Sequence, residues 1–126
     1  MHIHLRLAHR YPTEVVPGVT SLSGCWSAAG VPLMQGDDVF TVLPGTLDVD
    51  ELTRRLAGTD AAAIMKVGRH LPKIREALAA AGKLAGSVYV ERGTMVNAVV
   101  TPLAERDDSP APYFSVVLVP GWAERP

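Results

Sequence analysis

The sequence has little cysteine, few aromatic residues and no excess of either charge. Its single cysteine, Cys25, cannot form an internal disulfide. Twelve basic and thirteen acidic side chains leave a formal net charge of −1, so there is no positive field to hold nucleic acid or an anionic membrane. No stretch approaches the roughly 20 apolar residues that span a bilayer, and charges within residues 1–10 exclude a secretory signal. These features predict a cytoplasmic protein that binds neither nucleic acid nor membrane.

What the sequence does contain is enough apolar side chain for one core, since 48% of its 126 residues are hydrophobic. Hydrophobic periodicity and turn residues divide the chain into alternating strands and helices and then consecutive strands. This order predicts an α/β fold whose sheet is partly parallel and ends as an antiparallel meander. Strands are expected at 13–16, 38–43, 61–67, 87–90, 95–103 and 113–119, and helices at 21–29, 49–57 and 71–81.

The start of the chain is ambiguous, because residues 2–7 alternate like a strand and also fit a helical face. Elsewhere the signals are clearer. Asp48 followed by Glu51 forms a capping-box pattern for a helix. The near-continuous apolar run 61–67 is typical of a strand covered on both faces, and Pro72 suits the first turn of the next helix.

Four turns are candidate ligand sites, because open α/β sheets bind ligands beyond the carboxyl ends of their strands. They are residues 17–21, 65–69, 91–94 and 120–122. In the first turn, the backbone and hydroxyls of Thr20 and Ser21 at a helix start could meet a polar ligand. An ordinary turn with an N-cap is the alternative.

Basic side chains follow two of the expected strands. Lys66 and Arg69, beside the thioether of Met65, would suit a carboxylate-rich ligand, although a solvated basic pair remains the alternative. Arg92 is a further anion-binding candidate. On a strand, Glu91 and Arg92 would point to opposite faces and need not pair with each other. A structural ion pair of Glu91 is the alternative.

Histidine and cysteine give no catalytic or metal-binding pattern. No cysteine or acidic partner lies at ligand spacing from His2, His4, His9 or His70, so no metal is expected. Cys25 has no neighbouring base in the sequence and is interpreted as a packed thiol. Asp37 and Asp38 are interpreted as solvated carboxylates, and nothing indicates a hydrolase.

Several ordered strings carry a resemblance to a known family. VPGVTSLSGCW (16–26) resembles the segment that joins the two halves of tetrapyrrole methylases. Further strings, in order and at similar spacing, resemble the precorrin-2 C20-methyltransferase group of that family. They are QGDD (35–38), TVLPG (41–45), IMKVGR (64–69), VERGTM (90–95) and PYFSVVLVPG (112–121).

The resemblance implies a fold and an activity. Such enzymes move a methyl group from S-adenosylmethionine to a tetrapyrrole ring carbon, in cobalamin biosynthesis for this group, and hold the donor in a cleft between two α/β domains. Residues 17–126 would be the C-terminal domain, with a mixed sheet of about five strands and covering helices. Residues 1–16 would be a helix and last strand left from the N-terminal domain, whose glycine-rich donor loop the sequence lacks. Alone, such a chain is expected to be inactive.

The resemblance also implies site residues. Methyl transfer depends on placing the donor in line with a nucleophilic carbon, so no catalytic base is assigned and no metal is expected. The donor would contact Thr20, Ser21, Met65, Gly93 and Thr94, while Lys66, Arg69 and Arg92 are candidates for the substrate carboxylates.

Partner expectations follow from the same resemblance. The tetrapyrrole substrate, and a homodimer or a partner that supplies the missing N-terminal domain, are the expected partners. The alternative is a non-catalytic interaction module. Its apolar face would comprise Val15, Val16, Leu22 and Trp26.

Overall fold

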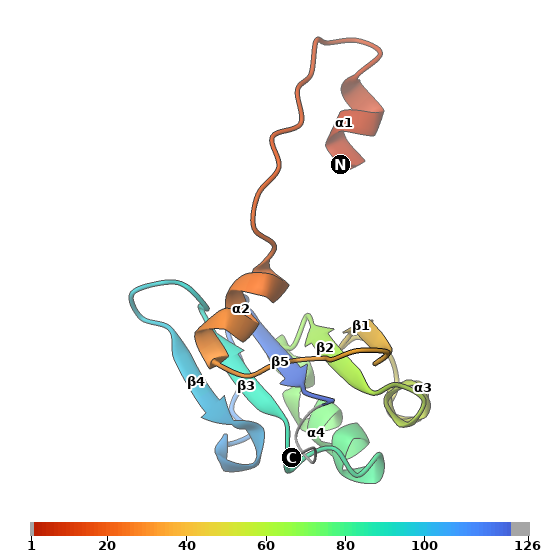
Figure 1. Ribbon diagram of the computed structural model, residues 1–126, viewed down its shortest axis with the longest axis vertical. Coiled ribbons are helices and arrows are strands. Elements are labelled where there is room, and N and C mark those ends of the chain that lie inside the picture. The colour runs from red at the N-terminus through yellow and green to blue at the C-terminus, as the bar shows by residue number, and fades with distance from the viewer. Residues whose placement is uncertain (1, 122–126) are drawn as a thin grey trace.

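A computed structural model describes residues 2–121 and shows a five-stranded mixed sheet within them (Figure 1). The strand order across the sheet is β1-β2-β5-β3-β4. This confirms the predicted α/β class with a mixed sheet and covering helices. The strands are β1 (Phe40–Pro44), β2 (Ala61–Met65), β3 (Val88–Glu91), β4 (Val99–Pro102) and β5 (Ser115–Val119).

Strand directions bring three strand ends to one side of the sheet. β1 and β2 are parallel, and β5 is antiparallel to both β2 and β3. β3 therefore runs in the same direction as β1 and β2. We call the side where these three strands end the carboxyl edge, comprising residues 44–45, 65–66 and 91–94.

The predicted closing meander is wrong, because β5 lies between β2 and β3 and not beyond β4. Burial gives the physical reason. Four of the five residues of β5 are buried, whereas β4 has two exposed valines, Val99 and Val100. Both strands have β-prone residues, so periodicity could not say which one is central.

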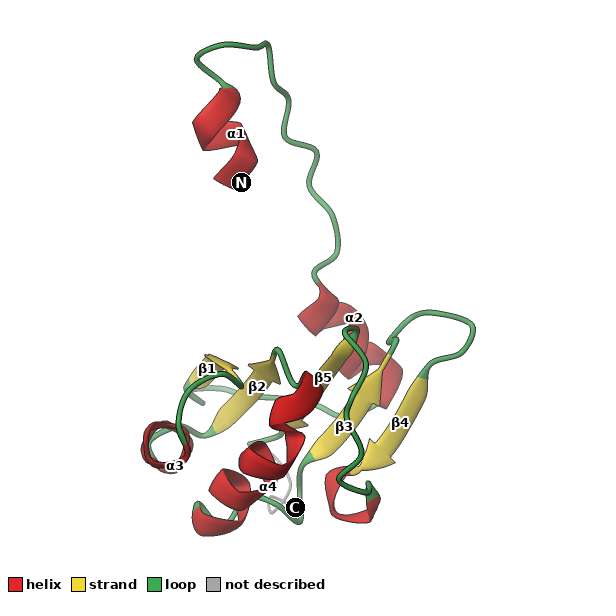
Figure 2. Ribbon diagram, turned by 180° about the vertical axis from the view of Figure 1, so that it is seen from behind, coloured by secondary structure: helices red, strands yellow, loops and turns green. Residues whose placement is uncertain are grey.

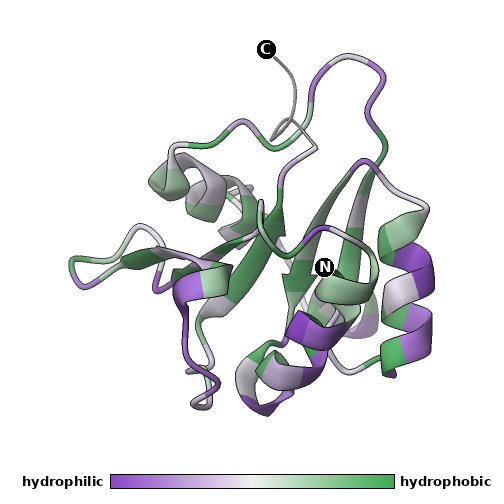
Figure 3. Ribbon diagram, turned by 90° about the horizontal axis from the view of Figure 1, so that it is seen from below, coloured by the Kyte–Doolittle hydropathy of each residue, from purple (hydrophilic) through white to green (hydrophobic). Residues whose placement is uncertain are grey.

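Helices cover both faces of the sheet. α2 (Ser21–Ala29) packs on one face, and α3 (Val49–Ala57) and α4 (Leu71–Ala80) pack on the other (Figures 1 and 2). Alternate residues of β2 divide between two cores: Ala63 belongs to the α2 side and Ile64 to the α3–α4 side. Figure 3 shows hydrophobic strands in the sheet and hydrophilic segments on α3, whose sequence is rich in charged residues.

The helix termini follow the predicted capping rules. The hydroxyl of Thr20 accepts a hydrogen bond from Ser23 N at 3.2 Å, and Asp48 Oδ1 accepts one from Glu51 N at 2.8 Å. α2 ends at Gly30, whose φ of 65° is left-handed. Both predicted helix starts are confirmed.

Within residues 2–121, one predicted strand is absent and others are shorter than predicted, since β2 ends at Met65, β5 begins at Ser115 and β4 is reduced most. Residues 12–20 form no strand, because they extend away from the sheet and pair with none of its strands (Figure 1). β4 begins at Val99 and not at Met95, since the amides of Met95 and Ala98 bond back to Arg92 O and Met95 O in turns.

The start of the chain is helical. α1 spans His2–Leu7, which confirms the helix that the family resemblance implied and contradicts the alternating strand pattern. Between residues 2 and 121, no helix is long and apolar enough to cross a membrane.

Candidate ligand site at the carboxyl edge

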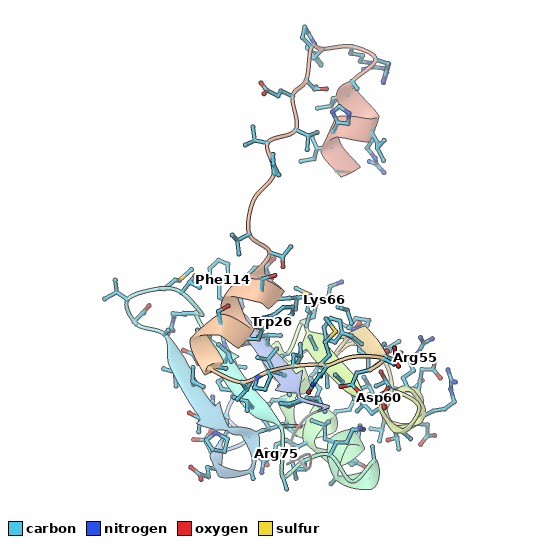
Figure 4. The ribbon with its side chains drawn as sticks, in the orientation of Figure 1. Trp26, Arg55, Asp60, Lys66, Arg75 and Phe114 are labelled. Atoms are coloured by element: carbon cyan, nitrogen blue, oxygen red, sulfur yellow. The ribbon has the colours of Figure 1, made fainter. Side chains whose placement is uncertain are left out.

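Predicted site residues from two different turns meet at the carboxyl edge. Met65 is the last residue of β2 and Lys66 follows it, while Arg92, Gly93 and Thr94 follow β3. The two strands are separated only by β5 and end on the same side. Lys66 and Phe114, which precedes β5, lie at this upper edge in Figure 4, and Asp60 lies at the opposite one.

The backbone at this edge is strained. Lys66, Arg92 and Thr94 have φ values of 57°, 50° and 70°, and no other described residue except glycine has a positive φ. Each such residue costs on the order of 1–2 kcal/mol, and strain of this kind gathers at functional sites. Sequence reasoning missed this feature, because lysine, arginine and threonine give no signal for a left-handed backbone.

Gly45 holds the end of β2 in place. Its N–H donates to Met65 O at 2.7 Å. A Cβ atom on Gly45 would lie 3.1 Å from the carbonyl oxygens of both Met65 and Lys66, and 2.8 Å from Ile74 Cδ1. Only glycine allows this approach, so Gly45 positions the Met65–Lys66 peptide. In the sequence, Gly45 had appeared only as the last residue of the string TVLPG (41–45).

α2 packs directly against the turn after β3. A Cβ atom on Gly24 would lie 3.0 Å from Thr94 Cγ2, and one on Gly93 would lie 2.6 Å from Cys25 Sγ. Thr20 and Ser21, at the start of this helix, are thereby joined to the carboxyl edge. The hydroxyl of Thr20 already serves as the N-cap, as the alternative interpretation of this turn had it.

Cys25 is a packed thiol, as predicted. Its side chain is buried between α2 and the sheet, and it forms no disulfide. Burial raises the pKa of this thiol, which keeps it protonated and unreactive near neutral pH.

Two cations at this edge have no acidic partner within residues 2–121. Lys66 and Arg69 are both exposed, and neither belongs to an ion pair there. Arg69 lies in a 3-10 helix (Gly68–His70) that is fixed where Ala111 N donates to Gly68 O. Partial burial, together with the charges of Lys73 and Arg69, lowers the pKa of His70. The region can therefore attract anionic groups.

Arg92 differs from these two cations, because its guanidinium pairs with Glu91. The expectation of opposite faces applied to two residues on a strand, but Arg92 lies beyond the end of β3, and its left-handed backbone lets its side chain turn back to its neighbour. The structural ion pair of Glu91, which was the alternative, is the one found. The second oxygen of Glu91, Oε2, accepts a hydrogen bond from the Tyr89 hydroxyl at 2.9 Å.

The other two predicted turns do not follow strands at this edge. Residues 17–21 follow no strand. Pro120 and Gly121 follow β5, which runs the other way, and Gly121 N donates to Leu33 O at the opposite edge. Trp122, the last residue of the predicted fourth turn, lies outside the described residues.

An apolar strip lies beside α2 on the same face of the sheet. Met65 and Val42 remain 36% and 46% exposed, although they share this face with the buried Ala63. Trp26 packs edge-on against Phe40, with ring centroids 6.2 Å apart. The strip can receive an apolar or aromatic part of a ligand next to the cations.

The alternative apolar face does not form one surface. Val15 and Val16 are 50% and 79% exposed on the extended segment, whereas Leu22 and Trp26 pack against the core on the α2 side. Across residues 2–121, no three histidine, cysteine, aspartate or glutamate side chains are grouped so as to hold a metal ion.

Comparison with known proteins identifies the class of this chain. Residues 1–107 match the family of tetrapyrrole (corrin/porphyrin) methylases, and the chain belongs to this family. Among its relatives, precorrin-2 C(20)-methyltransferase of Sinorhizobium sp. is 68% identical over 126 residues, which are 100% of this chain and 51% of that protein.

A second relative is cobalamin biosynthesis protein CobIJ of Mycobacterium bovis. It is 49% identical over 125 residues, which cover 99% of this chain and 25% of that protein. The chain thus spans about half the length of the first relative and about a quarter of the second.

Solved structures share the fold. Cobalt precorrin-4 methyltransferase, a cobalamin biosynthetic enzyme, aligns with a TM-score of 0.69 at 23% identity, over 98% of this chain and 58% of that one. Uroporphyrin-III C-methyltransferase of Thermus thermophilus, complexed with S-adenosylhomocysteine, aligns with a TM-score of 0.59 at 24% identity, over 92% and 56%.

Proposed function

We propose that the carboxyl edge is the C-terminal half of a methyl-donor site, in an enzyme that transfers a methyl group from S-adenosylmethionine to C20 of precorrin-2. The observation that carries this proposal is the meeting of Met65, Gly93 and Thr94 at one edge, in a chain 68% identical to a precorrin-2 C(20)-methyltransferase. The enzyme would be cytoplasmic and would work as a homodimer or with a partner.

The donor would lie along α2 and the apolar strip. Met65 offers a polarizable thioether, and Val42 beside it offers an apolar surface for the adenine ring. The Gly93–Thr94 turn and the helix start at Thr20 and Ser21 offer polar groups for the ribose and the amino-acid end. This arrangement supports orientation of the donor as the source of rate enhancement, without a catalytic base or a metal.

The substrate would approach from the side of the free cations. Lys66 and Arg69 have no acidic partner among the described residues and would bind carboxylates of the tetrapyrrole. Arg92 was the third candidate. Its pairing with Glu91 supports a role in holding the backbone of its own turn.

Calorimetric titration of the chain with S-adenosylhomocysteine tests the donor site. We expect micromolar binding, weakened about tenfold by Met65→Ala and less by Thr20→Ala, whose hydroxyl also caps α2. Met34→Ala is the matched control, because Met34 is similarly exposed, at 44%, but follows Leu33 at the opposite edge.

Two results would contradict the proposal. One is equal loss of affinity in Met65→Ala and Met34→Ala, which would place the ligand elsewhere. The other is no binding at millimolar ligand, which would favour the non-catalytic interaction module, of whose candidate face Val15 and Val16 are exposed. If the chain binds S-adenosylhomocysteine as expected, methyl transfer is measured next. The N-terminal half of the Sinorhizobium relative is added for this assay, because the chain spans only about half of that protein.

A further inference from the structure

Three side chains join the end of β3 to the turn that follows it. Tyr89 is fully buried, and its hydroxyl donates to Glu91 Oε2 at 2.9 Å. Tyr89 and Glu91 are two residues apart on a strand and so share a face. The other oxygen, Oε1, pairs with Arg92 Nη1, and the Glu91 side chain is only 13% exposed. Both oxygens of Glu91 therefore have partners, one of them anchored in the core.

This pair requires the unusual backbone of Arg92. On a regular strand, neighbouring side chains point to opposite faces and could not meet. Arg92 has left the strand with a φ of 50°, while its N–H still donates to Phe114 O at 2.8 Å and its carbonyl accepts from Met95 N at 2.9 Å. The ion pair and the left-handed backbone thus depend on each other.

The same turn sets the position of Gly93 and Thr94. Thr94 has a φ of 70° and packs against Gly24, and Gly93 packs against Cys25. A change of φ at Arg92 would move both residues relative to α2. The backbone conformation of Arg92 therefore determines where Gly93 and Thr94 lie relative to α2.

We propose that Tyr89, Glu91 and Arg92 are positioning residues that hold Arg92 and Thr94 of the turn 92–94 in their left-handed backbone conformation. Arg92 acts through the backbone and not by binding a substrate carboxylate. The proposal rests on the proposed function only in naming the ligand, S-adenosylhomocysteine, that the turn contacts.

Glycine at position 92 separates the backbone role of Arg92 from binding of a substrate carboxylate by its side chain, because glycine adopts a positive φ without needing an ion pair to hold it there. We expect Glu91→Gln and Arg92→Ala each to weaken S-adenosylhomocysteine binding about tenfold. The double variant Glu91→Gln/Arg92→Gly should recover most of the affinity. Glu51→Gln is the matched control, since it removes the two ion pairs of Glu51 with Arg54 and Arg55 on α3 and should leave the affinity unchanged.

A ligand-free measurement distinguishes failure of this proposal from failure of the donor site. The intraresidue NOE between HN and Hα is strong at positive φ, so we expect it to be strong for Thr94 in the wild type, weak in Glu91→Gln and strong again in the double variant. An unchanged NOE in Glu91→Gln overturns the positioning role, whether or not the ligand binds. An affinity in the double variant as low as in Arg92→Ala also overturns it. The expected NOE pattern without ligand binding supports the positioning role and refutes only the donor site.

Discussion

Replacing Gly93 by alanine tests the contact between α2 and the turn after β3. The added Cβ would lie 2.6 Å from Cys25 Sγ, 3.2 Å from Cys25 Cα and 3.2 Å from Val90 Cγ1. All three neighbours are in the packed core on the α2 side, so α2 must move. Overpacking of this kind costs about 2 kcal/mol. In a chain of this length that corresponds to a fall in Tm of about 8 °C.

Urea and thermal unfolding measure this change, with Gly18→Ala as the matched control. Nothing lies within 4 Å of the Cβ position at Gly18, so the control should stay within about 0.5 kcal/mol of wild type. Adding Cys25→Ala to Gly93→Ala removes the closest contact and should recover part of the loss. Equal stability of Gly93→Ala and Gly18→Ala would refute the packing of α2 against this turn.

Three other predictions concern the carboxyl edge and the stability of the fold. Gly45→Ala should move the Met65–Lys66 peptide and weaken S-adenosylhomocysteine binding, and full affinity in this variant would contradict the role of Gly45. Adding Ile74→Val removes the Cδ1 atom 2.8 Å away and should restore only part of the affinity, since the two carbonyl contacts at 3.1 Å remain. Arg75→Ala removes the hydrogen bonds to the carbonyls of Leu103 and Arg106 and should cost about 2 kcal/mol in urea unfolding, whereas a loss below about 0.5 kcal/mol would show that the loop after β4 does not need them. Hydrogen bonds from Arg54, and then from Arg55, lower the pKa of Glu51 from 4.5 to about 2. The ionised carboxylate therefore contributes its full stability above pH 4.5 and loses it as the pH falls toward 2. The difference in Tm between wild type and Glu51→Gln should be constant above pH 4.5 and disappear between pH 4.5 and 2.

Much of the fold could be predicted because its signals are local. Asp48 with Glu51 predicted the start of α3, and Thr20 or Ser21 predicted the start of α2, because capping joins residues close in sequence. The apolar run at 61–67 predicted a strand covered on both faces for the same reason, and the strand is found over Ala61–Met65. Helix caps and apolar runs depend on residues that are close together in the chain, so they can be predicted without knowing the tertiary structure.

The order of the last strands could not be predicted, because it depends on distant partners. β5 pairs with β2 and β3 through positions such as Val117, opposite Ile64 and Tyr89. Nothing local distinguishes this valine from the exposed Val99 of β4. As a result the sequence could not say that β1, β2 and β3 end at one edge while Gly121 lies at the other.

The two edges of the sheet differ in how their loops are held, and this difference supports the placement of the ligand site. At the edge away from the candidate site, Asp60 Oδ2 accepts from Val39 N at 2.8 Å and Thr59 Oγ1 donates to Val39 O at 2.8 Å, and the left-handed residue in the loop before β1 is a glycine, Gly36. At the carboxyl edge the left-handed positions include Lys66 and Thr94, where glycine would be less strained. Stability alone favours the first arrangement. Residues with side chains at strained backbone positions are explained if those side chains bind a ligand. The exposed ammonium of Lys66 beside Met65 is therefore the group to test first against a carboxylate ligand.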